Sequence, residues 1–469
     1  MSPTPRAFGA PVPTTPAPAA PARLRPSRVR HTVLGFAATL AIVTYVDRVC
    51  IAQAAPFIQA ELKLSATQMG VAFSAFSLAY ALFEIPGGWL GDLIGPRKVL
   101  MRVVVMWSVF TAATGYAWNL ASLMVARFLF GAGEAGCFPN LTKAFMIWLP
   151  AAERTRAQAV MWLSARWAGA FTPLLVIWVM SWLSWRNTFV LFGAMGVVWA
   201  IVFYSSFRDR PQDHPGVNSA ELELLRGNHA AGPTQPRVPW AKLARSRTVW
   251  LLWVQYFCLT YGWYFYVTWL PTYLRETRGL ELNQNAFMFW LEGILSGHLA
   301  PDTARKVLVA ALAGIPLFFG GLGCIVTGFV TPRLTRLLRD VARTRRLLAL
   351  VGFSTASVLL VSSFYIGDPL LAMVAMGLAS LGNDLTMPGS WSTCMDVGGS
   401  YAGTLSGSMN MMGSFGAMLA PLVIGMILDF TGRSWAVTFW ISGTIYFLGG
   451  ICWLFLDPVT PITAEENPT

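Results

Sequence analysis

Long apolar stretches separated by short polar segments dominate the pattern of this chain of 469 residues. Each stretch is long enough to cross the roughly 30 Å hydrocarbon core of a bilayer as a helix, for which about 20 apolar residues suffice. Helices satisfy their own backbone hydrogen bonds, as a membrane interior requires. The stretches lie near 32–55, 67–91, 97–118, 120–144, 155–183, 186–207, 248–274, 307–331, 346–366, 369–392, 402–429 and 434–456.

A polar interval divides these stretches into six and six. Residues 208–247 are rich in proline and charge, and we expect one short helix there, near Ser219–Arg226. Equal halves around a linker indicate a duplicated architecture. We predict an all-α polytopic membrane protein, with twelve transmembrane helices in two six-helix bundles. Its segments are a disordered tail (1–30), the first bundle (31–207), the linker (208–247), the second bundle (248–457) and a C-terminal tail (458–469).

One segment of the second half, 280–306, does not fit this plan. Its apolar part is too short to span a bilayer. We therefore expect an insertion on the outer surface, with an amphipathic helix near 285–299.

The charge pattern indicates the topology. The chain is 55% hydrophobic and only 12% charged, which excludes an ordinary soluble globule. A net charge of +12 would suggest nucleic acid as the partner of a soluble protein. Here the basic residues gather in alternate segments, including 23–30, 97–102 and the linker. Cytoplasmic loops carry such an excess, so we place both termini in the cytoplasm of a cell with the protein in its inner (plasma) membrane, and we expect no nucleic acid partner.

The residues that usually carry enzyme chemistry are scattered. The six cysteines stand singly in apolar runs, without a CxxC or Cys/His cluster, and the four histidines lie outside the spans. We therefore expect no metal, no cofactor and no enzymatic activity.

The fourth apolar stretch contains two ionisable residues, Arg127 and Glu134. They are seven residues apart and so share one face of a continuous helix. An ionisable group at mid-membrane depth is costly, and such groups mark functional sites by default. Two interpretations remain open, a structural salt bridge between them or one side of a pathway for substrate and protons.

The segment between the second and third stretches, GGWLGDLIGPRK at 87–98, resembles the signature loop of the major facilitator superfamily. In that loop an aspartate and basic residues lock the inner gate. Asp92 can accept hydrogen bonds from Arg97 or from helix N-termini. The resemblance implies gating roles for Gly88, Asp92, Gly95, Arg97 and Lys98.

The chain departs from that pattern in two places. Leu93 stands where the family has a basic residue, and Thr331 stands in the second half where an acid would be expected. We therefore expect the second gate to be weaker or differently built.

A narrower resemblance covers nearly the whole chain. The motifs YVDR at 45–48, RFLFGAGEAG at 127–136 and FPN at 138–140 are similar to those of the anion:cation symporter family, as are segments at 391–398 and 403–410. That family includes hexuronate, sugar-acid and aromatic-acid symporters. The resemblance implies that Arg48 and Arg127 bind the anion while Asp47 and Glu134 exchange the proton.

The residues support that chemistry independently. A carboxylate in a low-dielectric cavity needs a cation, and arginine offers a fork that stays charged. Neighbours on a helix point about 100° apart, so Asp47 and Arg48 cannot face the same point, and one interpretation makes Asp47 structural.

Other polar residues in the spans are further candidates. Arg166 is either a third cation of the substrate site or a partner for Glu84 or Asp384. Asn410 and Tyr261 are candidate substrate contacts.

The sequence thus favours proton-coupled uptake of a small organic anion by alternating access, with a hexuronate, aldonate or related sugar acid as substrate. The partners are the anion, protons and the lipid bilayer, and we expect a monomer. An aromatic or dicarboxylic acid symporter is the nearest alternative. A drug efflux carrier and a sensor that no longer transports remain open, although buried arginines argue against a cationic substrate.

Overall fold

The computed structural model describes residues 25–226, 238, 240–273, 277, 293–294, 297 and 301–462. The helix expected near 285–299 lies outside the described residues, as do most of the two terminal tails. Helices make up nearly all of the described chain.

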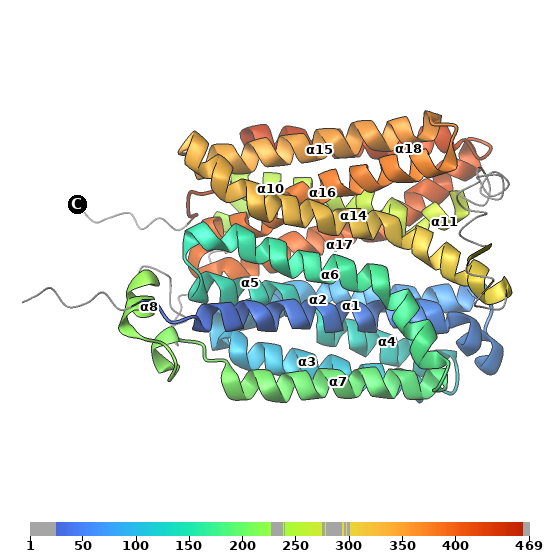
Figure 1. The fold of residues 1–469 in the computed structure, drawn as a ribbon, viewed down its shortest axis with the longest axis horizontal. Helices are drawn as coiled ribbons and strands as arrows, with labels where there is room; N and C mark the ends of the chain where they lie inside the picture. Colours follow the sequence, from blue (N-terminus) through green and yellow to red (C-terminus); the bar gives the residue numbers. More distant parts are fainter. Residues whose placement is uncertain are drawn as a thin grey trace, which may run out of the picture.

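Helices of the first half lie together in the lower part of Figure 1, coloured blue to green. They are α1 (Val29–Leu62), α2 (Ala66–Ile94), α3 (Pro96–Gly115), α4 (Leu120–Glu134), α5 (Cys137–Trp148), α6 (Ala151–Met180) and α7 (Trp185–Ser206).

Helices of the second half form the upper part of Figure 1, coloured yellow to red. They are α10 (Arg247–Thr268), the short α11 (Leu270–Tyr273), α14 (Pro301–Leu338), α15 (Val341–Tyr365), α16 (Pro369–Gly398), α17 (Ala402–Phe430) and α18 (Trp435–Phe455). Helix α14 already begins inside the segment 280–306 that the sequence assigned to an insertion.

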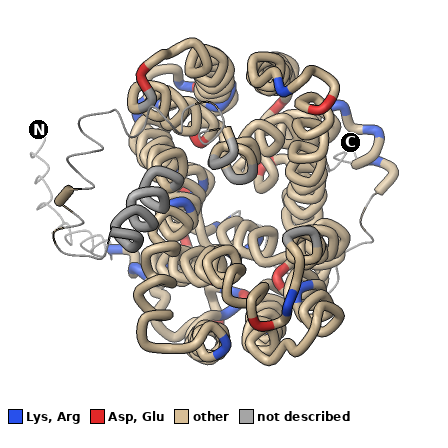
Figure 2. The backbone as a smooth tube through the Cα atoms, turned by 90° about the vertical axis from the view of Figure 1, so that its right-hand side faces the viewer, with Lys and Arg blue, Asp and Glu red and all other residues tan. Residues whose placement is uncertain are grey.

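Ten stretches of the described chain are long and apolar enough to cross a membrane, and one of them, Leu370–Phe430, contains both α16 and α17. Large apolar side chains such as Ile201, Val358 and Phe447 are exposed on the outside of the helices. Seen end-on in Figure 2, most of each helix is uncharged. A surface of this kind suits lipid, so the chain is a multi-pass membrane protein, as predicted.

The fourth predicted span is not one continuous helix. It is α4 and α5, which meet at Ala135 and Gly136, immediately after Glu134. Gly136 has a φ of 83°, a conformation that costs a residue with a side chain about 1–2 kcal/mol. A Cβ there would also lie 2.6 Å from the Cα of Gly87 in α2. The break therefore requires glycine, and it brings α2 against the end of α4.

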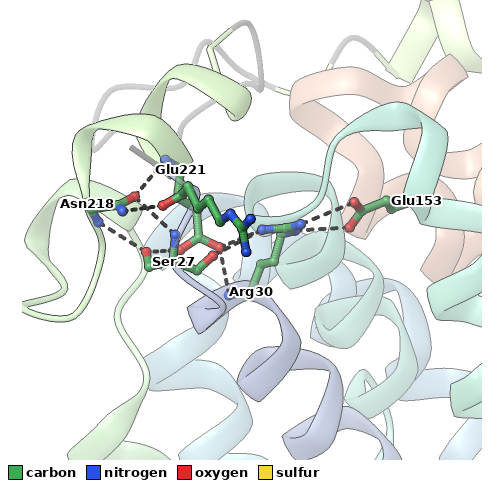
Figure 3. Close-up of polar contacts among 6 residues, drawn as sticks. Ser27, Arg30, Glu153, Asn218 and Glu221 are labelled. Carbon is green, nitrogen blue, oxygen red and sulfur yellow. Dashed lines mark hydrogen bonds and ion pairs between the residues drawn. The ribbon is translucent and has the colours of Figure 1, made fainter. Parts of the chain in front are cut away.

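The linker contains α8 (Ser219–Leu224), at the position where a short helix was expected, and α9 (Trp240–Arg245). Figure 3 shows how α8 is held against the bundle. Arg30 of α1 forms ion pairs of 3.1 Å with Glu221 of α8 and with Glu153 of α6. Asn218 accepts from the backbone N–H of Ser27 at 3.1 Å. The linker is thus fixed to the first helix group.

The two ends of the helical body differ. We call the end that carries the start of α1, the linker helix α8 and the last described residues the linker end, at the left of Figure 1. The other, which carries the α1–α2 and α7 N-terminal turns, is the far end.

Candidate functional site

A small cavity of about 80 Å³ lies between the two helix groups. Both groups line it, the first through α1, α2, α5 and α6 and the second through α10, α16 and α17. Towards the far end it adjoins a larger cleft of about 1320 Å³, with which it shares Arg48, Phe76, Trp263 and Tyr264. The chain is therefore open towards the far end and closed at the linker end.

Arg48 lines both the cavity and the cleft. Its guanidinium carbon lies 4.4 Å from the ring centroid of Tyr80 and 5.5 Å from that of Phe76, so aromatic faces stabilise the charge. Its Nε donates to Glu134, while its Nη2 has no hydrogen-bond partner within the described part of the chain. This arrangement leaves donors for an anion.

Glu134 forms an ion pair with Arg48. The sequence had offered Arg127 as its partner, because Arg127 and Glu134 are seven residues apart and share a helix face. The side chain is fully buried at the last residue of α4, and its Oε2 has no partner among the described residues. A buried carboxylate held by one arginine is a group that must gain a proton if that arginine binds another anion.

Arg127 lines the larger cleft and not the central cavity. It packs over the rings of Phe130 and Phe76, with centroid distances of 4.5 and 5.1 Å. Asp47 lines neither, because it points the other way from Arg48 and accepts a hydrogen bond of 3.1 Å from the indole of Trp107 in α3. Asp47 and Arg48 thus lie on different faces of α1, Asp47 against α3 and Arg48 at the cavity.

Arg166 lines the cavity and is already paired. It makes a bidentate contact with Asp384 of α16, at 2.7 and 2.8 Å, and its guanidinium carbon lies 4.3 Å from the ring centroid of Trp263. The pair joins α6 of the first helix group to α16 of the second. Of the two partners considered for Arg166, Asp384 is the one it contacts.

Asn410 of α17 lines the cavity and donates to Glu84 at 2.7 Å and to the Tyr80 hydroxyl at 3.1 Å. Tyr261 does not line either cavity, although its neighbours Thr260 and Tyr264 do. As a substrate contact, Tyr264 is better placed than Tyr261.

The linker end is closed by Asp92. Its carboxylate accepts from the backbone N–H of Gly403 at 3.1 Å and from both the N–H and the hydroxyl of Thr404 at 2.6 Å. Those N–H groups begin α17, which has no side-chain cap of its own, so Asp92 caps this helix from the opposite bundle. Lys143 adds an ion pair of 3.0 Å to the same carboxylate.

The other residues of the signature loop divide into two groups. Gly88 lies against the backbone of Gly403, so it takes part in the contact between the bundles. Gly95 has a φ of 87° and lets Asp209 accept from the backbone N–H of Arg97 at 2.8 Å. The Arg97 guanidinium donates to the Tyr204 carbonyl at 2.6 Å, and Lys98 is exposed. Burial raises the pKa of Asp209, which the contacts with Arg97 and Lys98 lower in part.

A second closure exists and is differently built. Asp396 of α16 accepts from Arg154 of α6 and from Arg345 of α15, each at 2.6 Å. An acid was expected at the position of Thr331 in α14 but is absent there. Asp396 of α16 is the acid that connects the two bundles instead, through Arg154.

The sequence did not lead us to predict a role for Lys143 or the aromatic rings of Tyr45, Phe76 and Tyr80 around Arg48. The sequence does contain a signal for these aromatic rings. Tyr45 precedes Arg48 by three residues and Tyr80 precedes Glu84 by four, so each shares a helix face with an ionisable neighbour. For Lys143 the signal was a lone cation at the end of an apolar run.

Within the described residues there is no cluster of His, Cys, Asp and Glu that could hold a metal ion. The site instead offers an arginine with free donors, a carboxyl paired with that arginine, and polar contacts from both bundles. Such a site suits binding of an anion together with movement of a proton.

The model of the Major Facilitator Superfamily matches residues 37–421 of this chain. The probable sulfoacetate transporter SauU of Cupriavidus necator is 33% identical, over 93% of this chain and 96% of that protein. The hexuronate transporter of Bacillus subtilis is 26% identical over 89% and 91%, and the D-galactonate transporter of Escherichia coli is 27% identical over 91% and 95%.

Among solved structures, a crystal structure of the fucose:proton symporter FucP of Escherichia coli has a TM-score of 0.62 and covers 91% of this chain and 99% of its own. At 14% identity this likeness concerns the fold alone. It confirms the prediction of twelve transmembrane helices in two six-helix bundles. The chain therefore belongs to the major facilitator superfamily and, within it, to the group of transporters that includes these sugar-acid and organic-anion carriers.

Proposed function

We propose that this protein carries a small organic anion into the cell together with protons, through the cavity between its two bundles. The observation that carries the proposal is the Arg48–Glu134 pair. Its arginine lines the cavity and, within the described residues, has a donor without a partner, and its carboxyl has an unpartnered oxygen.

The proposed cycle starts from the arrangement described above. An anion from the far end passes through the cleft, near Arg127, and takes the donors of Arg48. Glu134 then loses its ion pair and gains a proton from water, since a buried carboxylate without a cation is costly. The neutralised site allows the bundles to rock, and both the anion and the proton leave at the linker end.

The direction of transport rests on the basic residues of the linker and of the loops at the linker end, which favour the cytoplasm. Closure at that end by Asp92, Lys143 and Asp396 corresponds to an outward-facing state. Opening inwards must separate Asp92 from the N-terminus of α17 and Asp396 from Arg154.

The substrate is a compact acid in this proposal. Polar groups for hydroxyls are available on Thr260, Ser414 and Asn410, which suits a hexuronate or aldonate. Aromatic rings of Tyr45, Tyr80 and Trp263 line the same space and suit a smaller or flatter acid equally well. The 33% identity to a probable sulfoacetate transporter adds a sulfonated acid to the candidates.

Uptake into proteoliposomes tests the proposal. The panel is radiolabelled glucuronate, galactonate, glucarate, sulfoacetate and an aromatic acid, each with and without an inward proton gradient. We expect one class to accumulate only with the gradient, and Glu134→Gln to lower the accumulation that the gradient drives. Accumulation that ignores the gradient would overturn the proton coupling, and no uptake of any acid would overturn the substrate class.

A further inference from the structure

Glu84 of α2 is a carboxyl that the cycle above does not use. It is fully buried, and within the described residues no lysine or arginine forms an ion pair with it. Its Oε1 accepts from Asn410, and its Oε2 has no partner there. A buried carboxylate without a cation is costly, so this environment favours the protonated form.

The charges around Glu84 agree with this. Arg48 of α1 acts on it, but that cation is engaged by Glu134 of α4. Cys137 of α5 is a neutral neighbour, Tyr80 on α2 offers a hydroxyl, and α17 offers only the Asn410 amide. Arg166 is matched by Asp384. In the first bundle, Arg48 and Arg127 thus face Asp47, Glu84 and Glu134, which leaves one more acid than cations in this part of the described chain.

The position of Glu84 connects the cavity to the closed end. Tyr80, Glu84, Gly88 and Asp92 follow one another at intervals of four residues, so they share one face of α2. That face lies against α17. Tyr80 and Glu84 contact Asn410, a Cβ at Gly407 would lie 2.7 Å from the Glu84 carbonyl, and Asp92 caps the start of α17.

Opening of the linker end has to separate these two helix faces. Separation withdraws Asn410 from Glu84 and lets water from the linker end reach the carboxyl. In the closed arrangement the carboxyl does not line the cavity itself, but it contacts Asn410, which lines the cavity together with Tyr80.

We propose that Glu84 is a second proton-carrying carboxyl of the transport site, in addition to Glu134, protonated while α2 and α17 are in contact and deprotonated when they separate. The proton comes from water at the far end and is given to water at the linker end, and only O–H bonds are made and broken. The proposal rests on proton-coupled transport and adds one proton to each anion carried.

The test compares wild type with Glu84→Gln in proteoliposomes, using the acid that the uptake panel identifies. With the membrane potential held at zero, each coupled proton multiplies the final accumulation ratio about tenfold per pH unit of gradient. Glutamine keeps an acceptor for Asn410 but carries no exchangeable acid proton. We therefore expect the ratio to fall about tenfold at a gradient of about one unit, and Glu84→Asp to retain the wild-type ratio.

A second measurement protects against a variant that does not fold. The infrared difference spectrum between wild type and Glu84→Gln, both without substrate, should contain a protonated-carboxyl band, and that band should shift when Glu84→Asp replaces wild type. An unchanged accumulation ratio in Glu84→Gln, or an unshifted band in Glu84→Asp, would overturn the role of Glu84 while leaving the proposed function standing. Wild-type uptake that ignores the proton gradient would overturn both.

Discussion

Among single residues, Arg48 offers the site something that a simple cation does not. Its guanidinium donates to Glu134 through one edge while Nη2 remains free, and the rings of Tyr80 and Phe76 hold it in place. A planar fork can keep a carboxylate on one edge while the other recruits an anion.

Replacing Arg48 by lysine should therefore weaken substrate binding although the charge remains. We expect a loss of about 1.5–3 kcal/mol, or about tenfold to a hundredfold in Kd, because a charged hydrogen bond is lost. Direct binding to the purified protein measures this. The matched control is Arg186→Lys, since Arg186 pairs with Glu61 away from the cavity. Equal affinities of wild type and Arg48→Lys would show that the two-edged guanidinium of Arg48 is not needed for substrate binding.

The sequence identified the ionisable residues of the site but not all of their partners. Periodicity placed Arg127 and Glu134 on one helix face, yet Glu134 pairs with Arg48 of α1. Periodicity describes one helix, and it cannot say which neighbouring helix packs closest. The same limit left Arg166 without a definite partner until α16 was seen beside α6.

At the scale of helices, the closed end depends on caps that come from elsewhere in the chain. Asp209 accepts from the first turn of α3, and Asp92 caps α17 across the bundle interface. Because Asp92 caps α17 only while the linker end is closed, opening that end removes the cap and destabilises the N-terminus of α17. Lys143 lies fully buried beside Asp92 and neutralises it.

Lys143→Met should loosen this closure. Breaking a buried ion pair by removing one partner costs about 3–5 kcal/mol, which is enough to shift a two-state equilibrium more than a hundredfold towards the open linker end. A cysteine placed at Ala402, buried in the closed state, should then react faster with a membrane-impermeant thiol reagent applied from that end.

The control for that experiment is Arg97→Gln. Arg97 belongs to the same loop, but its guanidinium donates to Tyr204 within the first bundle. Its loss should leave the labelling rate of the cysteine unchanged. Equal labelling rates in wild type and Lys143→Met would show that Lys143 does not hold the linker end closed.

Helix positions were largely predictable, because long apolar runs in a membrane protein leave few alternatives. The break between α4 and α5 was not. Residues 131–136 read GAGEAG, and nothing in that run distinguishes the one glycine that adopts a positive φ from those that remain helical. Its position is set by Gly87 of α2, which leaves no room for a side chain.

At the scale of the whole molecule, two bundles enclose a site that is open at one end. The sequence predicted the two bundles through the equal spacing around the linker. It did not predict which end would be closed, because the contacts that close it, Asp92 with Thr404 and Asp396 with Arg154, cross the bundle interface. The combination of an anion site and a closed end is what alternating access requires.

In the proposed cycle the anion binds Arg48 and Glu134, released from its ion pair, takes up a proton. The most direct measurement is the pH change when the transported acid is added to the purified protein in weakly buffered solution. We expect that binding takes up protons and raises the pH, and that Glu134→Gln binds the acid with a smaller proton uptake. Binding without proton uptake, or with the same uptake in wild type and Glu134→Gln, would contradict it.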